Sequence, residues 1–142
     1  MKAVVLSKVE AKTALKIPLY QSRVSAGFPS PADDFIEKRI DLNEHLIHNP
    51  SSTYLVRASG ESMKEAGIFP GGVLVVDRSK RPEHNAVVIA SIDGELLVKR
   101  LKKSKGKIWL MAENPDYPPI EMTDENELMI WGVVTNVIHN LE

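Results

Sequence analysis

A serine in a glycine-containing turn and a lysine on an apolar strand are the residues of this chain that together suggest hydrolytic chemistry. Ser62 lies in the segment Ser59–Met63 (SGESM), and Lys99 lies 37 residues later in Glu95–Leu101 (ELLVKRL). Burying an ammonium group without a partner is unfavourable, so a lysine on an apolar face tends to lose its proton. A neutral lysine beside a serine can act as a general base beside a nucleophile. The pair therefore predicts a serine hydrolase that uses a lysine as its base.

The surroundings of Lys99 follow from a predicted hairpin. Asp93-Gly94 between two apolar runs is typical of a two-residue turn, and this turn places Lys99 opposite Val88. The residues expected on the same face are all aliphatic: Ala86, Ala90, Leu97 and Leu101. Arg100 is expected on the opposite face, where its charge would lower the lysine pKa further. The alternative is a lysine whose stem packs on leucine while its ammonium group reaches water.

The segment around Ser62 is suited to presenting a nucleophile. Gly60 allows a sharp turn that exposes the serine hydroxyl and nearby backbone N–H groups to a substrate carbonyl, as an oxyanion hole requires. The segment is not a Gly-x-Ser-x-Gly elbow, because residue 64 is lysine, and not a Ser-x-x-Lys motif, because residue 65 is glutamate. Taken alone, a serine in such a turn is more often a helix cap or an ordinary loop residue than a nucleophile.

Composition limits the class of protein. The chain has 142 residues, of which 43% are hydrophobic and 26% charged, and its formal net charge is −1, so bulk electrostatics give no reason to expect nucleic-acid binding. The absence of cysteine excludes disulfides, thiolate metal sites and a cysteine nucleophile. We expect no metal and no cofactor. Apolar runs are far shorter than the roughly 18 residues that span a bilayer, and no secretory signal is visible, which predicts a cytoplasmic protein.

The elements that must position this pair are mainly strands. From residue 51 onward, apolar runs alternate with Gly, Pro and Asp clusters, which predicts about six strands. The expected strands are Tyr54–Arg57, Val73–Asp77, Ala86–Ile92, Glu95–Leu101, Lys107–Ala112 and Leu128–His139. Residues 1–26 are expected to form an N-terminal arm, 27–50 an extended linker and 51–142 the β domain. Within the linker, the apolar pattern of Asp33–His48 favours a short helix capped by Asp33 or Asp34.

Several blocks of the chain resemble the LexA/UmuD family of self-cleaving proteins. They include the serine and lysine segments above, and also Gly27–Ala32 (GFPSPA), Arg39–Asn43 (RIDLN) and Trp131–Val134 (WGVV), so that the resemblance covers nearly the whole chain. It implies a mostly β fold of the LexA/UmuD peptidase type with a long extended N-terminal arm.

The resemblance also implies an activity and a substrate. Ser62 would be the nucleophile and Lys99 the base of a Ser–Lys dyad that cuts the protein's own Ala26–Gly27 bond. Members of the UmuD type often have cysteine before this glycine, whereas this chain has Ala26, a small residue that should fit the same pocket. Val24–Gly27 provides one apolar anchor followed by small residues, as a narrow pocket requires, although residues 22–32 on their own would also suit a flexible linker.

Partners are implied by the same resemblance. They are a second copy of the chain in a homodimer, the RecA–single-stranded DNA filament that stimulates cleavage, and a UmuC-type Y-family DNA polymerase that uses residues 27–142 for error-prone translesion synthesis in the SOS response. A repressor role is disfavoured, because 26 residues before the cut are too few for a helix-turn-helix domain. The remaining alternative is a non-catalytic homodimeric interaction subunit in which Ser62 and Lys99 are structural.

Overall fold

The computed structural model describes residues 1–10, 16–20, 36–123 and 128–142. The chain divides into two compact units, one formed by residues 1–9 and 51–142 and the other by residues 10–50. The expected cleavage bond between Ala26 and Gly27 lies outside the described residues. In the part of the chain that is described, no helix is both long and apolar enough to cross a membrane.

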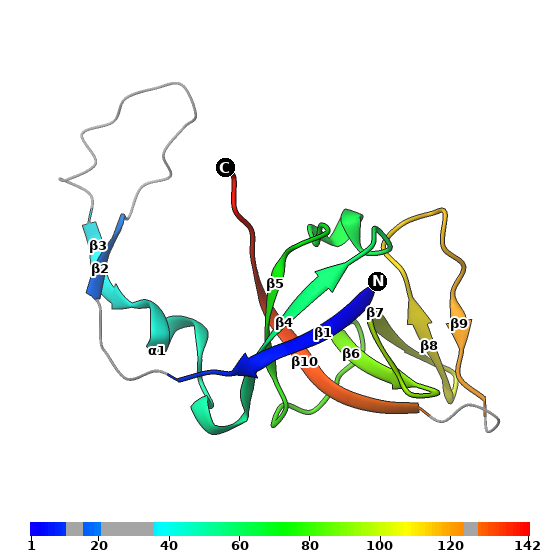
Figure 1. Cartoon of the computed structure of the whole chain (residues 1–142). Helices are drawn as coiled ribbons and strands as arrows, with labels where there is room; N and C mark the ends of the chain where they lie inside the picture. Colours follow the sequence, from blue (N-terminus) through cyan, green and yellow to red (C-terminus); the bar gives the residue numbers. More distant parts are fainter. Residues whose placement is uncertain (11–15, 21–35, 124–127) are drawn as a thin grey trace. The chain divides into compact units, whose positions relative to one another are not determined.

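The larger unit is built on an antiparallel sheet whose strand order is β1-β4-β5-β10-β6-β7-β8-β9. Its strands are β1 (Lys2–Lys8), β4 (Thr53–Ser59), β5 (Val73–Asp77), β6 (Val87–Ile92), β7 (Glu95–Ser104), β8 (Lys107–Met111), β9 (Ile120–Glu121) and β10 (Leu128–Ile138). Strand β1 pairs with β7 as well as with β4. Six strands therefore form a closed ring, from which β8 and β9 continue the sheet (Figure 1). Closure removes most of the exposed edges that an open sheet would present.

The expected hairpin of β6 and β7 is confirmed. Asp93 and Gly94 have φ angles of 49° and 85°, the positive values that a type I′ turn needs at both central positions. The register pairs Val88 with Lys99. The mostly β fold is also confirmed. The predicted strand Val73–Asp77 has the observed bounds of β5, and the other five predicted strands differ from the observed ones by at most three residues at an end.

The smaller unit contains β2 (Lys16–Tyr20), β3 (Ile36–Asp41) and the one-turn helix α1 (Leu42–Leu46). The expected helix over Asp33–His48 is wrong for most of its length, because residues 36–41 pair as a strand with β2. Pairing with a distant segment overrides the local pattern here. Asp41 caps the short helix by accepting a hydrogen bond from the Asn43 N–H at 2.9 Å. The expected caps, Asp33 and Asp34, lie outside the described residues.

Two buried apolar clusters flank the sheet of the larger unit. One contains Met1, Ala3, Val56, Ala58, Met63, Ile68, Leu74, Val76, Ile89 and Val98. The other contains Val88, Ala90, Leu101, Leu110 and Val133. Because Lys99 lies opposite Val88 in the β6–β7 ladder, its side chain lies with the second cluster, and a lysine is the exception in this apolar setting.

Candidate active site

Ser62 lies in the turn that leaves β4 and enters a short 3-10 helix over Lys64–Ala66. Gly60 has a φ of 87°, a conformation that glycine adopts without the penalty other residues have, and it bends the chain two residues before the serine. Ser62 and Met63 are fully buried. The side chain of Met63 anchors the turn in the first apolar cluster, so the serine hydroxyl is held by a packed segment and not by a mobile loop.

The loop that follows β8 holds the turn around Ser62 in place through two hydrogen bonds. The Glu113 N–H donates to the Ser62 carbonyl at 2.8 Å, and the Asn114 side-chain amide donates to the Glu61 carbonyl at 2.9 Å. Asn114 is itself buried, and its side-chain oxygen accepts from the Asp116 N–H at 3.0 Å. Sequence reasoning missed this positioning residue. Asn114-Pro115 is typical of a turn, but nothing in the sequence connects that turn with a segment 50 residues earlier.

Lys99 occupies a special place on β7. The edge of β7 pairs with β1 at Leu97 and with β8 from Arg100 onward, so Lys99 lies where one partner strand replaces the other. Its side chain is 5% exposed. None of the acidic side chains in the described ranges forms an ion pair with it. The predicted burial of this lysine on an apolar strand face is therefore confirmed.

Burial lowers the pKa of Lys99 below its ordinary value of 10.5. The Tyr117 ring, whose centroid lies 5.7 Å from Nζ, acts in the opposite direction, because an aromatic face stabilises a cation. This contact offsets only part of the desolvation, because the pKa of Lys99 remains lowered. Desolvation therefore determines the sign, and the neutral amine is favoured relative to a free lysine.

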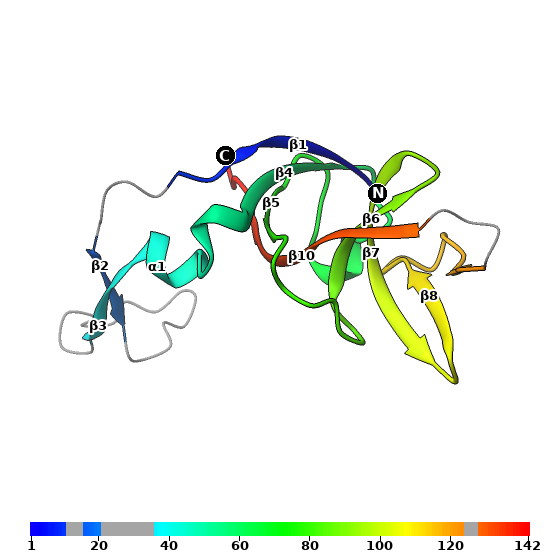
Figure 2. The same ribbon diagram turned by 90° about the horizontal axis from the view of Figure 1, so that it is seen from below.

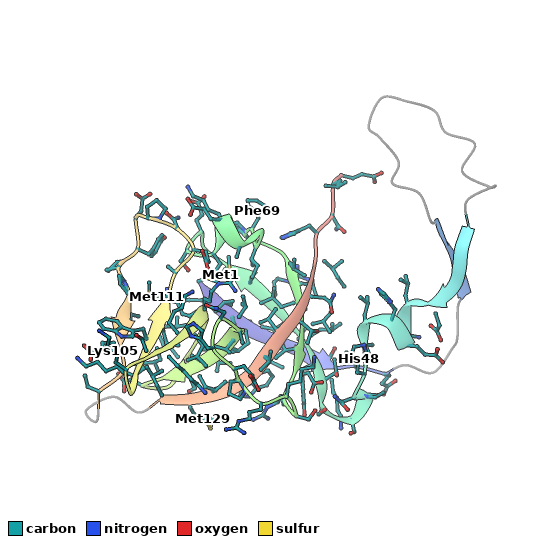
Figure 3. All side chains as sticks on the ribbon, turned by 180° about the vertical axis from the view of Figure 1, so that it is seen from behind. Met1, His48, Phe69, Lys105, Met111 and Met129 are labelled. Carbon is teal, nitrogen blue, oxygen red and sulfur yellow. The ribbon has the colours of Figure 1, made fainter. Side chains whose placement is uncertain are left out.

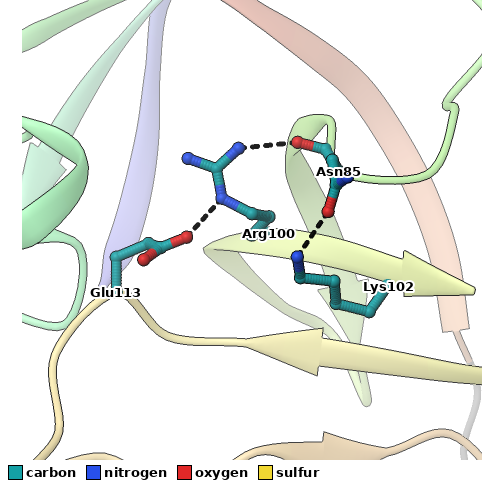
Figure 4. A network of polar contacts seen from close by, with 4 residues as sticks. All are labelled: Asn85, Arg100, Lys102 and Glu113. Carbon is teal, nitrogen blue, oxygen red and sulfur yellow. Dashed lines mark hydrogen bonds and ion pairs between the residues drawn. The ribbon is translucent and has the colours of Figure 1, made fainter.

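Arg100 does not contribute to this shift, contrary to expectation. Its guanidinium forms an ion pair with Glu113 and donates to the Asn85 carbonyl at 2.6 Å, while Lys102 donates to the Asn85 side chain (Figure 4). The Glu113 carboxylate offsets the arginine charge, and desolvation is the cause of the lowered Lys99 pKa. The network also connects β7 to Glu113, the residue whose N–H holds the Ser62 carbonyl.

The N-terminal amino group also lies at this site, beside Ser62. The α-amino group of Met1 donates a hydrogen bond to Ser62 Oγ. Desolvation, followed by the charge of Lys99, lowers the pKa of this amino group from 8.0 to about 6. Met1 therefore contacts the serine directly and lies close enough to the lysine for the lysine charge to affect its pKa. The N-terminus lies beside β7 in the ribbon (Figure 2), and the Met1 side chain lies within the larger unit (Figure 3).

These features can support acyl transfer. A hydroxyl held in a packed turn and an amine that loses its proton more easily than a free lysine are the two groups that Ser–Lys chemistry needs. The fold and the site define the class of protein as a serine peptidase of the Ser–Lys type.

Comparison with known proteins agrees with this class. Residues 18–135 match the family described as Peptidase S24-like, and the chain belongs to this family. It is 45% identical over 128 residues to Protein ImpA of Salmonella typhimurium, covering 86% of this chain and 83% of ImpA. It is 48% identical over 122 residues to Protein SamA of the same species, covering 86% of this chain and 84% of SamA.

The relatives also identify the branch of the family. Protein MucA of Escherichia coli is 42% identical over 137 residues, covering 96% of this chain and 93% of MucA. LexA repressor 1 of Pseudomonas syringae is 42% identical over 117 residues, but these are only 57% of its length. The protein is a UmuD-like self-cleaving serine peptidase, an accessory subunit of SOS mutagenesis.

Proposed function

We propose that Ser62 is the nucleophile and Lys99 the general base, and that they cut the Ala26–Gly27 bond of this chain. One observation carries the assignment: a fully buried serine and a nearly buried lysine, from segments 37 residues apart, lie around the same amino group beside β7. An ion pair or a structural hydrogen bond would hold the lysine charged. Burial without an acidic partner among the described residues favours the neutral form that a base requires.

The reaction follows from these two groups. Neutral Lys99 takes the proton of Ser62 Oγ as that oxygen attacks the carbonyl carbon of Ala26. The C–N bond to Gly27 then breaks, and the protonated lysine gives its proton to the leaving amine. Water, deprotonated by the same lysine, hydrolyses the acyl-enzyme and restores the serine. Backbone N–H groups in the turn around Ser62 would stabilise the oxyanion in both steps.

The proposed domain organisation makes the cut a means of regulation. Residues 1–26 form the removable arm, 27–50 a linker and 51–142 the peptidase and dimerisation domain. We propose that the RecA–single-stranded DNA filament stimulates the cut, and that the product starting at Gly27 serves a UmuC-type Y-family polymerase in the cytoplasm. The UmuD-like relatives support these partners as a class.

The test is cleavage at neutral pH with and without RecA filaments on single-stranded DNA. We expect the filament to accelerate the appearance of a fragment whose first residue is Gly27, and Ser62→Ala to stay intact under both conditions. A fragment that starts elsewhere would contradict the assigned bond. Cleavage of the Ser62→Ala variant at the wild-type rate would support the alternative of a non-catalytic interaction subunit that a contaminating protease cuts.

A further inference from the structure

Strand β1 closes the ring of the sheet at the candidate active site. It pairs antiparallel with β4, from Lys2 opposite Ser59 to Lys8 opposite Tyr54, and Lys2 also lies opposite Leu97 of β7. The Val98 N–H donates to the Met1 carbonyl at 2.7 Å. Both views of the ribbon place the start of β1 beside β7 (Figures 1 and 2). The start of β1 thus lies between β4 and β7 and pairs with both strands.

The side chains of β1 show which face is held. Met1 and Ala3 are 7% and 8% exposed and pack in the cluster that contains Ala58, Met63 and Ile68. Val4, the next residue, is 62% exposed. The first residues of the chain, covered on one side at Met1 and Ala3 and paired along both edges at Lys2, are bound in the way that proteins bind extended peptides by strand addition, whereas the rest of β1 is exposed.

The start of β1 occupies the place where a scissile carbonyl would have to lie. A carbonyl carbon must approach Ser62 Oγ to about 3–3.5 Å before attack. In this structure the Met1 amino group is hydrogen-bonded to that oxygen, and Ser62 has no exposed surface. The substrate segment and β1 cannot occupy the site together.

We infer that the strand position between β4 and β7 is an acceptor site for an extended peptide, and that β1 occupies it as an internal competitor of the cleavage segment. Cleavage then requires β1 to leave first, and the cut at Ala26–Gly27 severs β1 from the domain. The inference rests on the proposed function, because it concerns access to Ser62. It adds a specific inhibitory element, residues 1–8, to the arm.

The first test locks β1 in place with a disulfide. Val4 and Arg57 are exposed cross-strand partners, and the natural chain has no cysteine, so Val4→Cys combined with Arg57→Cys adds one crosslink between β1 and β4. We expect the oxidised full-length protein to be cut at alkaline pH roughly tenfold or more slowly than the same protein after reduction. Each single cysteine variant is the control and should cleave equally with and without oxidant.

The second test releases β1. Ala3→Asp puts a carboxylate on the covered side of the strand, whereas Val4→Asp puts the same charge one residue later on the open side. We expect Ala3→Asp to cleave several-fold faster than wild type, and Val4→Asp to cleave at the wild-type rate. A synthetic peptide of residues 1–9 should slow the Ala3→Asp variant, and the same peptide with Ala3→Asp should not.

The outcomes separate the inference from the function beneath it. Equal cleavage of the oxidised and reduced double-cysteine protein would overturn the inference while leaving the dyad intact. So would a folded Ala3→Asp variant, verified by circular dichroism, that is cut no faster than Val4→Asp. Absence of cleavage in the reduced form and in wild type alike would instead reject the proposed function.

Discussion

At the scale of single residues, two amino groups share the surroundings of the Ser62 hydroxyl. The Met1 α-amino group donates to Oγ, and Lys99 lies close enough for its charge to lower the Met1 pKa. The charge of Lys99 favours the neutral form of the Met1 amino group, whereas desolvation is what lowers the pKa of Lys99 itself. The reactivity of this site therefore depends on whether the two amino groups are protonated.

The pH dependence of self-cleavage follows from the lowered pKa of Lys99. The deprotonated form is the base, so the rate should rise with pH and level off once the lysine is neutral, at a lower pH than the 10.5 of a free lysine would give. Lys99→Arg keeps the charge but stays protonated, so we expect the rate to fall roughly 100-fold or more. The rate of fragment formation from pH 6 to 11 checks both statements. An arginine variant that cleaves at the wild-type rate near neutral pH would rule out Lys99 as the base.

The position of Lys99 could be predicted from the sequence, but most of the residues that surround the site could not. The Asp93-Gly94 turn fixes the hairpin register, and the register alone places Lys99 opposite Val88. Asn114 and Tyr117 escaped prediction because they reach the site through a loop whose path depends on tertiary contacts. The pairing of Arg100 with Glu113 was missed for the same reason.

At the scale of elements, β10 shows how closely the strands of the ring pack. Its ladder with β6 shifts register between Ile130 and Gly132, an irregularity that lets the long strand bend. A Cβ atom on Gly132 would lie 2.5 Å from Cγ1 of Val76, a fully buried side chain on β5. There is no room for even one methyl group at this crossing.

Gly132→Ala should therefore destabilise the domain by about 1–3 kcal/mol, the usual cost of overpacking a core. Gly72→Ala is a matched control: its Cβ would meet the ring of His139 at 2.5 Å and the Phe69 carbonyl oxygen at 3.1 Å, but that ring is a partly exposed side chain that can move if its hydrogen bonds to Gly67 and Phe69 are lost. We expect the control to cost less. Urea unfolding followed by circular dichroism measures both, and equal stability of Gly132→Ala and wild type would show that β5 and β10 are less tightly packed than the structure indicates.

The strands could be predicted where nearby turn residues and apolar alternation determine them. Hairpin turns and alternating runs predicted β4, β5, β6, β7, β8 and β10, because their patterns are local. The short strand β9 was not expected, since two residues carry no pattern. Strand β3 was mistaken for a helix because its partner β2 lies far away in the sequence. The pairing of β1 with β4 and β7 joins segments about 50 and 95 residues apart, which no local pattern predicts.

At the scale of the whole molecule, exposed apolar side chains on and beside β10 support the homodimer that the family resemblance implies. Met129 and Ile138, near the two ends of β10, are 54% and 47% exposed, and Phe69 is 51% exposed beside His139. Large exposed apolar side chains of this kind are typical of surfaces that meet a partner.

We expect light scattering at micromolar concentration to give about twice the chain mass of 15.8 kDa. Ile138→Asp should weaken the dimer, because a carboxylate would be buried in an apolar interface, while Asp93→Asn, in the turn between β6 and β7, is the control and should not. A mass near that of one chain for the wild-type protein would refute the homodimer.

The central claim is that this chain cuts itself with its own serine, and intact-mass spectrometry of the purified protein at alkaline pH tests it most directly. Incubation near pH 10 without any activator should convert wild type to a product that begins at Gly27, with the complementary fragment that ends at Ala26. Ser62→Ala, incubated in parallel, should keep its full mass. Conversion of the Ser62→Ala variant at the wild-type rate, or a full-length wild type after prolonged incubation, would contradict the account.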